Sequence, residues 1–204
     1  MRLLPGIIAV ALLALLTGCR SRPSGVDYDQ WKEALETRHA TAARHVTALA
    51  GFEVDLLRTA TKPEGSWVSL EFDDRGRLLI GREGPGILRL TLPRWRLGRT
   101  KVEVINNELK ECRGLLWAHG SLYANANNSK GLYRLRDTTG DDQLDEVTLL
   151  RKTGGGVGHG RNSLALGPDG LIYLAHGNDV LLPEDFKPGP ASTYRNYSRD
   201  QLLP

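Results

Sequence analysis

Residues 70–80, LEFDDRGRLLI, and residues 164–174, LALGPDGLIYL, share one pattern: an apolar run, a turn that contains glycine, and a second apolar run. A looser copy, LLWAHGSLY, lies between them at residues 115–123. An Asp beside glycine suits the positive φ angles of tight turns, so the pattern predicts a β-hairpin at each place.

These hairpins repeat with a period of about 45 residues, the length of a propeller blade. The turn glycines, Gly76, Gly120 and Gly170, are 44 and 50 residues apart. A second element repeats in phase, because GILRL at residues 86–90 matches GLYRL at residues 131–135, 45 residues later. Each blade of a β-propeller is a four-stranded sheet that buries its faces against its neighbours. The sequence therefore predicts an all-β fold, a partial β-propeller.

Short β-type runs between turn residues predict the individual strands. They lie near residues 53–59, 67–72, 77–81, 87–92, 101–105, 114–117, 121–124, 131–136, 146–151, 163–166 and 171–175. Residues 51–182 thus hold two to two and a half blades, fewer than the four to eight that close a propeller. We expect a truncated piece of a longer protein. The alternative, a ring of several copies, needs matched symmetric edges.

The N-terminus has the pattern of an export signal. Arg2 supplies a positive charge, residues 3–16 are almost wholly apolar, and LTGC follows at residues 16–19. The run is shorter than the ~20 residues of a transmembrane helix, and its end resembles a bacterial lipobox. We therefore predict a signal peptide over 1–18 and a lipid on Cys19, which would anchor the chain to a membrane of the bacterial cell envelope, facing outside the cytoplasm. The alternative is an ordinary signal peptide with a coincidental cysteine.

Three further segments flank the predicted blades. Residues 19–30 are polar, contain Pro and Gly, and predict a tether. Residues 31–50 show helical spacing of apolar residues before Gly51 and predict a helix. Residues 183–204 have few apolar residues and predict a truncated or irregular tail.

Charge and cysteine content exclude some functions. The chain has 27 Lys and Arg residues against 24 Asp and Glu residues, with no basic block, so a nucleic-acid partner is not expected. With Cys19 acylated, Cys112 has no partner for a disulfide; a small buried apolar residue is expected there, and a reactive thiol is the alternative. No Cys-x-x-Cys-His occurs, so the chain attaches no haem.

Several motifs resemble a family of exported propellers related to the soluble quinoprotein glucose and sorbosone dehydrogenases. The motifs are GFEV at 51–54, GSWVSL at 65–70, residues 131–147, GGVGHGRNSL at 155–164, GPDGLIY at 167–173 and the Gly-Asn-Asp run at 177–179. Some relatives are membrane-associated dehydrogenases fused to a c-type cytochrome. The resemblance covers about residues 51–182 and implies a six-bladed propeller that oxidises a sugar or alcohol with pyrroloquinoline quinone (PQQ).

By this resemblance, His159 is the general base that takes a proton from a sugar hydroxyl while hydride passes to the quinone. Arg161 and Asn162 would contact substrate or quinone oxygens, and glycines on both sides of His159 would let backbone approach a ligand. The electron acceptor would be a protein such as a cytochrome c. Ser163 departs from the family, which often has Arg there. The later blades supply the remaining cofactor contacts, so this fragment is expected to be inactive alone.

An acidic loop at residues 137–146 resembles a Ca²⁺ loop. Asp137, Asp141 and Asp145 would be the oxygen ligands. The loop departs from the pattern, because Thr139 replaces the third-position acid and Asp142 replaces the glycine. The alternative is an acidic hairpin tip in water.

A second function from another class also fits the predicted fold. A non-catalytic envelope propeller would bind polysaccharide or protein, since propellers host many functions. His159 and its glycine loop distinguish the two hypotheses.

Overall fold

The computed structural model describes residues 39–94 and 98–182. The chain divides into two compact units, residues 1–55 and 56–204. Within the described ranges the regular structure is β-strand, apart from one turn of 3₁₀ helix, η1 (Ala43–His45), so the predicted all-β class is confirmed. No helix in these ranges is long and apolar enough to span a bilayer.

The predicted helix over 31–50 is wrong for the residues that can be compared. Residues 31–38 lie outside the described part, as do the predicted signal peptide, tether and tail. Over residues 39–50 only η1 is helical; Ala42 and Val46 on either side are extended, and none of its residues is buried. A short helix is marginal in water without a face to bury, and the apolar face of this segment is thin.

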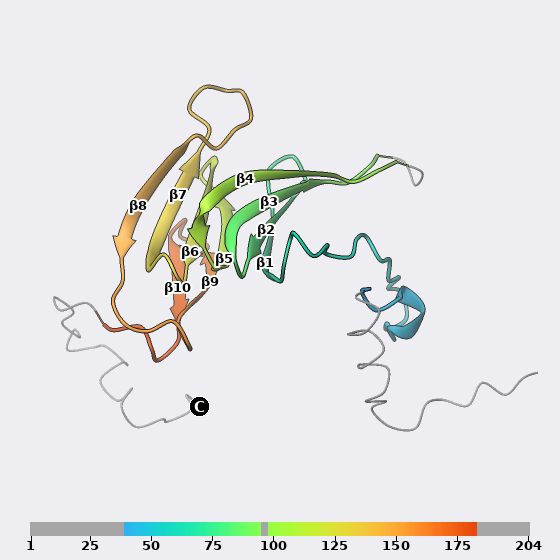
Figure 1. Ribbon diagram of the computed structural model, residues 1–204, viewed down its shortest axis with the longest axis horizontal. Coiled ribbons are helices and arrows are strands. Elements are labelled where there is room, and N and C mark those ends of the chain that lie inside the picture. Colours follow the sequence, from blue (N-terminus) through green and yellow to red (C-terminus); the bar gives the residue numbers. More distant parts are fainter. Residues whose placement is uncertain (1–38, 95–97, 183–204) are drawn as a thin grey trace, which may run out of the picture. The chain divides into compact units, whose positions relative to one another are not determined.

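The second unit contains three antiparallel sheets, which Figure 1 shows in chain order. Sheet 1 consists of β1 (Trp67–Phe72), β2 (Leu78–Arg82), β3 (Pro85–Thr91) and β4 (Lys101–Lys110). Sheet 2 consists of β5 (Cys112–Ala118), β6 (Ser121–Ala126), β7 (Gly131–Arg136) and β8 (Glu146–Lys152). Sheet 3 is the hairpin of β9 (Arg161–Leu166) and β10 (Ile172–His176).

Ten of the predicted strands are found, and β1 and β7 have the predicted bounds. The strand predicted at 53–59 is absent: the segment is in none of the sheets of the described ranges, and Val54, Leu56 and Leu57 are exposed. A β-type composition produces a strand only where a pairing edge and a packing surface exist.

The first hairpin of each sheet, called here the inner hairpin (β1–β2, β5–β6 and β9–β10), contains a register shift at a corresponding position. The sequence repeat is therefore also a structural repeat. The register shifts between Trp67 and Ser69 in sheet 1, between Cys112 and Gly114 in sheet 2, and between Leu174 and His176 in sheet 3. Such bulges bend a strand and increase its twist. Each sheet therefore begins with a hairpin that is bent at a corresponding position.

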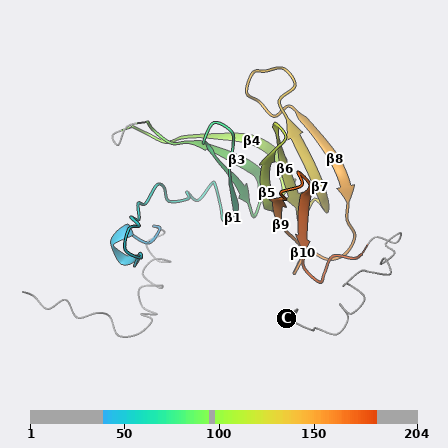
Figure 2. The same cartoon turned by 180° about the vertical axis from the view of Figure 1, so that it is seen from behind.

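The first strands of the sheets lie side by side, β1 next to β5 and β5 next to β9. Figure 2 shows the same succession from behind. Side chains bridge both junctions: Ser69 Oγ donates to the Cys112 carbonyl (2.5 Å), and Asn125 Nδ2 donates to the Asn162 carbonyl (3.0 Å). A Cβ on Gly81 would overlap the same Cys112 carbonyl, so glycine permits the close approach.

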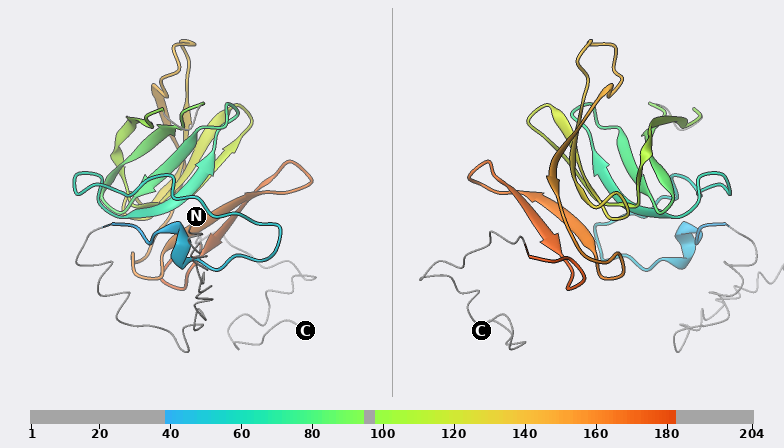
Figure 3. Two further views of the ribbon diagram at one scale, coloured as in Figure 1. Left: turned by 90° about the vertical axis from the view of Figure 1, so that its right-hand side faces the viewer. Right: turned by 60° about the vertical axis from the view of Figure 1, so that its left-hand side comes forward.

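Apolar side chains fill the space between successive sheets. One core cluster joins Leu79 and Ile87 of sheet 1 to Leu115, Leu122 and others of sheet 2. A second cluster on the other face of sheet 2 contains Leu116, Ala118, Tyr123 and Leu132, with Leu164 and Ile172 of sheet 3 packed against it. Figure 3 shows the β9–β10 hairpin, in orange, beside sheet 2.

Cys112 belongs to the first of these clusters and is fully buried. Burial raises the pKa of its thiol to about 12, because the thiolate would lose its hydration. The expectation of a small buried apolar residue is confirmed, since the side chain is fully buried and a thiol with this pKa stays protonated near neutral pH.

A polar network also joins sheet 1 to sheet 2, centred on Asp142 in the β7–β8 loop. Arg77 binds its carboxylate through both Nη atoms, with Nη2–Oδ1 at 2.8 Å, and Arg89 Nη1 donates to its carbonyl at 2.8 Å. Asp73, which is buried, holds Arg77 from the other side, with Nε–Oδ2 at 2.6 Å. Hydrogen bonds from Arg77, with the charges of Arg89 and Arg75, lower the pKa of Asp142 to about 2.

We predict that Asp142→Asn lowers the free energy of unfolding at neutral pH by about 1–2 kcal/mol, because the ion pair is only half-exposed. The pKa of Asp142 is lower in the folded chain than the ~3.9 of a free Asp, so its contribution is present above pH ~4 and is lost as the pH falls towards 2. Urea titrations followed by tryptophan fluorescence from pH 7 down to pH 2 would show a shallower acid loss in the variant.

Asp141→Asn is the matched control, since the carboxylate of Asp141 accepts only the Gln143 N–H in the described part of the chain. Asn tolerates the positive φ of Asp142, so the test substitution leaves the backbone unstrained. Equal acid profiles for the two variants would contradict the role given to Asp142.

Candidate functional site

Two loops meet at one end of sheets 2 and 3. The first, residues 153–160, connects β8 to β9 and contains five glycines; the second, residues 177–181, follows β10. Backbone hydrogen bonds join them: Gly156 N–H donates to the Asp179 carbonyl (2.8 Å), Asp179 N–H to the His159 carbonyl (3.1 Å), and Gly177 N–H to the Gly160 carbonyl (2.7 Å). The two loops therefore form one surface.

His159 lies on this surface with an exposed side chain. Its backbone N–H donates to Asp179 Oδ2 (2.9 Å), and its ring Nδ1 lies 3.0 Å from Asn178 Oδ1. An amide oxygen accepts hydrogen bonds, so this contact favours the tautomer with the proton on Nδ1 and the lone pair on Nε2. The contact orients the ring, and in this tautomer Nε2 is the ring atom that can accept a proton.

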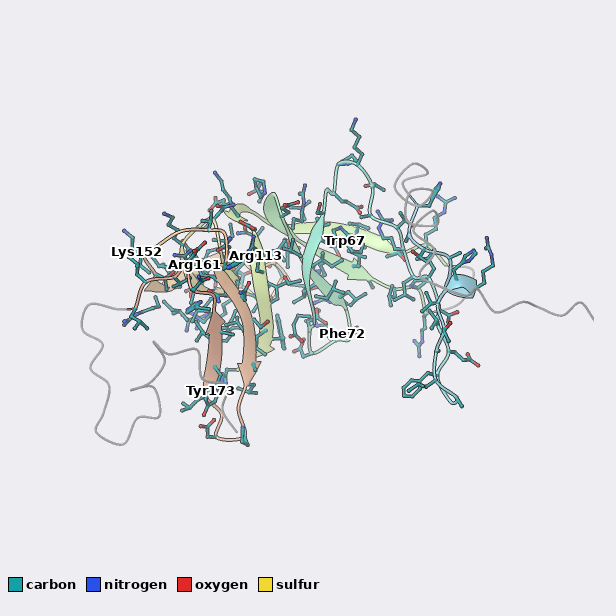
Figure 4. All side chains as sticks on the ribbon, turned by 90° about the horizontal axis from the view of Figure 1, so that it is seen from below. Trp67, Phe72, Arg113, Lys152, Arg161 and Tyr173 are labelled. Carbon is teal, nitrogen blue, oxygen red and sulfur yellow. The ribbon has the colours of Figure 1, made fainter. Side chains whose placement is uncertain are left out.

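Side chains from sheets 2 and 3 hold the carbonyl groups of the first loop. Arg113 Nη1 donates to the Gly158 carbonyl (2.8 Å), and Asn127 Nδ2 donates to the Val157 carbonyl (2.8 Å). Figure 4 shows Arg113 and Arg161 near one another, at the other end of the strands from Phe72 and Tyr173. Hydrogen bonds from these side chains thus hold the backbone of the loop that carries His159.

Arg161 makes the largest share of these contacts. Its side chain is fully buried, and its five N–H groups donate to the Thr153 hydroxyl (2.5 Å) and to backbone carbonyls of Thr153 (3.0 Å), Gly154 (2.7 Å), Gly156 (2.9 Å) and Asn127 (3.2 Å). Within the described residues it forms no ion pair with a carboxylate. Desolvation by burial accordingly lowers its pKa, although an arginine remains charged.

The buried network beneath the loop includes residues that sequence reasoning missed. Glu111, itself buried, accepts from Asn127 Nδ2 (2.9 Å), Asn128 Nδ2 (2.6 Å) and Arg113 Nε (2.7 Å). Asn127 Oδ1 in turn accepts the Arg161 N–H (2.9 Å). No local motif marks Glu111 or Asn127, because their partners lie up to 34 residues away in the chain.

The structure gives Arg161 a different role from the expected one. We expected it to contact substrate or quinone oxygens, but all five of its N–H groups are used inside the protein, so it does not fit a cofactor contact in this arrangement. Asn162 does fit: it is half-buried, and its side-chain amide makes no hydrogen bond to another described residue. A contact from Asn162 to quinone or substrate stays a prediction.

Close backbone packing explains two of the loop glycines. Gly155 has a φ of 93°, and a Cβ there would overlap the Asp179 carbonyl. A Cβ on Gly160 would overlap the Asn127 amide oxygen. We expected the glycines to let a ligand approach the backbone. At Gly155 and Gly160 they instead let other parts of the protein pack closely against the loop.

A cavity of about 560 Å³ adjoins the two loops. It is lined by Arg151, Lys152, Thr153, Gly154, His176, Gly177, Asn178, Val180, Leu181 and Leu182. Asn178 therefore both lines the cavity and orients the ring of His159. Its volume lies within the range of small-molecule sites, roughly 300–1,000 Å³.

The predicted calcium ligands are engaged by their own loop. Asp137 accepts three backbone N–H groups, those of Thr139, Gly140 and Asp142, and Asp145 accepts the Thr138 N–H. Hydrogen bonds from backbone and hydroxyl groups lower the pKa of both carboxylates. No group of three or more potential metal ligands lies together in the described ranges. The three residues do not fit a Ca²⁺ site in this arrangement, and Ca²⁺ binding stays a prediction.

Cys19, the predicted lipid attachment site, lies outside the described residues, and the anchor at the cell envelope stays a prediction.

We predict that Arg161→Met releases the loop, because it leaves backbone carbonyls without donors. The free energy of unfolding should fall by about 2 kcal/mol. Amide hydrogen exchange at Gly156 and His159, whose N–H groups donate to Asp179, should accelerate. The control is Arg136→Met, which removes one exposed ion pair to Glu146 and should cost at most ~1 kcal/mol. Unchanged exchange at both amides in Arg161→Met would contradict the role of Arg161.

Compared with protein-family models, curated proteins and solved structures, the chain matches none of them. The chemistry of the site therefore has to follow from its own contacts: an oriented imidazole, a rigid glycine loop and an adjoining basic cavity.

Proposed function

We propose that the chain is the N-terminal part of an exported, lipid-anchored, PQQ-dependent dehydrogenase of sugars or alcohols, built on a β-propeller. The observation that carries the proposal is the His159–Asn178 pair. Asn178 leaves Nε2 of His159 as an exposed proton acceptor beside a cavity of ligand size. Oxidation of a hydroxyl needs such an acceptor, since the hydroxyl proton and the hydride on carbon must leave to different places.

In this reaction the chain's own residues handle the proton. Nε2 of His159 takes the proton from the substrate hydroxyl, the carbon–oxygen bond becomes a carbonyl, and the hydride leaves from carbon. A quinone, when bound, supplies the hydride acceptor. Asn178 keeps the ring in the productive tautomer, and the Asp179 carboxylate holds the His159 backbone. Arg113, Asn127 and Arg161 keep the loop from moving as the charge on His159 changes.

A propeller completed by further sheets is supported by which faces of successive sheets pack against each other. In sheet 2 the row Leu115, Ala124, Tyr133 and Leu149 crosses neighbouring strands, and sheet 1 packs against this face. The corresponding row in sheet 1 is Leu70, Ile80, Leu88 and Val104. Leu70 and Val104, at its ends, are 60% and 57% exposed.

Each interface therefore joins unlike faces, one face of a sheet to the opposite face of its neighbour. A head-to-tail contact of this kind closes only as a ring. Exposed Tyr173, on the face of sheet 3 turned away from sheet 2, and the Leu70 row on sheet 1 mark the surfaces that further sheets would cover. This arrangement supports a propeller that extends beyond the sheets described.

A non-catalytic propeller that binds envelope polysaccharide is the second candidate. It is favoured by the internal use of all five Arg161 N–H groups, which leaves one fewer contact for a cofactor. In this alternative the cavity would bind a saccharide without oxidising it.

The propeller proposal predicts that Leu70→Glu is costly in the complete protein. A glutamate at a covered position has no counter-charge, so the free energy of unfolding should fall by about 2–4 kcal/mol. The control is Leu57→Glu, at a residue that is similarly exposed (57%) and lies outside every strand. A Leu70→Glu cost no greater than that of Leu57→Glu would show that no further sheet covers this face.

The dehydrogenase proposal predicts that His159→Ala reduces sugar-dependent dye reduction by about 10²–10⁴-fold, the usual contribution of a general base. The assay uses the full-length form of the protein with added PQQ and Ca²⁺ and a panel of sugars. Activity lost in His159→Ala should return partly with added imidazole. His45→Ala, at an exposed residue of the first unit, is the control. Turnover of no sugar by the unmodified protein, or equal turnover by His159→Ala, would refute the proposal.

A further inference from the structure

The cavity beside His159 has an unusual charge. Lys152 lies on its wall, and none of its described lining residues is Asp or Glu. Salt does not screen charges in such a recess as fully as on an open surface. A ligand with a negative group would therefore gain more there than a neutral one.

Arg161 adds to this positive potential from behind the wall. Its guanidinium is fully buried and is solvated by carbonyl and hydroxyl oxygens, with no carboxylate paired to it in the described part of the chain. Two of those carbonyls belong to Thr153 and Gly154, which line the cavity. His176 also lines the cavity, and its pKa is lowered by desolvation and by the charge of Arg161. The charge of Arg161 is therefore felt at the cavity wall.

The backbone of the wall contributes donors of the same polarity. In a trans peptide the N–H points opposite to the C=O, and Arg161 holds the carbonyls of Thr153 and Gly154. The N–H groups of Gly154 and Gly155 consequently point away from the guanidinium, and neither donates to another described residue. Gly154 lines the cavity, so its N–H is a further donor available to an anion there.

The remaining lining suits a sugar. His176, neutral near pH 7 because its pKa is lowered, and the Asn178 amide can hydrogen-bond hydroxyl groups. Val180, Leu181 and Leu182 offer an apolar wall to the C–H face of a pyranose ring.

We infer that this cavity binds the carboxylate of an acidic sugar, a uronic acid or a uronate residue of a polysaccharide, and that Lys152 is its principal charge contact. The inference rests on the proposed sugar oxidation, whose substrate class it names. Asn178 connects the two, since it lines the cavity and orients His159, so a sugar held by its carboxylate has its hydroxyls on the side of the imidazole.

Calorimetric titration of the 204-residue chain with glucuronate and with glucose tests the inference directly. Glucuronate should bind at least about tenfold more tightly than glucose, as a charge-assisted hydrogen bond requires, and the difference should shrink at high ionic strength. Lys152→Gln should remove most of the difference. Lys152 is exposed at the end of β8, so this variant keeps the fold. Lys110→Gln, at an exposed lysine at the end of β4 that does not line the cavity, should bind as the parent does.

Equal affinity for glucuronate and glucose would overturn the inference, as would glucuronate binding that Lys152→Gln leaves intact. PQQ also carries carboxylates, so it is titrated in parallel. Binding of PQQ but not of glucuronate, lost in Lys152→Gln, would assign the cavity to the cofactor and overturn the sugar-acid assignment. Because these titrations need no turnover, a chain that binds glucuronate yet oxidises no sugar would refute the dehydrogenase proposal while the binding site stands.

Discussion

The buried guanidinium of Arg161 is the constraint on which the candidate site depends. A charge without a carboxylate partner is costly to bury, and here its cost is offset by oxygen atoms that the glycine loop supplies. The loop can supply them only by curling around the guanidinium, and the backbone needs glycine to do so where Gly155 and Gly160 meet neighbouring atoms. The position of His159 is thus a consequence of how Arg161 is solvated.

The same charge connects the two halves of the proposed function. Towards the interior it fixes the loop that presents His159, and towards the cavity it favours an anionic ligand and a neutral His176. A carboxylate paired with Arg161 would have cancelled this potential. An arginine paired only with neutral groups provides rigidity and a positive field together.

Much of the fold could be predicted from the sequence, because hairpins are local. Gly76, Gly120 and Gly170, with their apolar flanks, located the three inner hairpins, and the bulge shared by those hairpins confirms their equivalence. The helix prediction was wrong over residues 39–50, because the spacing of apolar residues does not show whether a helix has a surface to pack on. His159 was selected by the family resemblance and its glycine-rich surroundings, and its role stays a prediction. The network of Glu111, Asn127 and Arg161 could not, because side chains far apart in sequence meet only after the sheets have stacked.

Asp142 shows how one residue can satisfy a local and a long-range requirement together. It stands where a calcium loop has glycine, and its φ of 69° keeps the left-handed backbone that glycine would provide. Unlike glycine it has a carboxylate, which reaches Arg77 on the neighbouring sheet. Meanwhile Asp137 and Asp145 use their oxygens to cap the N–H groups of the turn. The loop is therefore shaped by its own backbone and attached by an ion pair, so the junction between the first two sheets is held without requiring a cation.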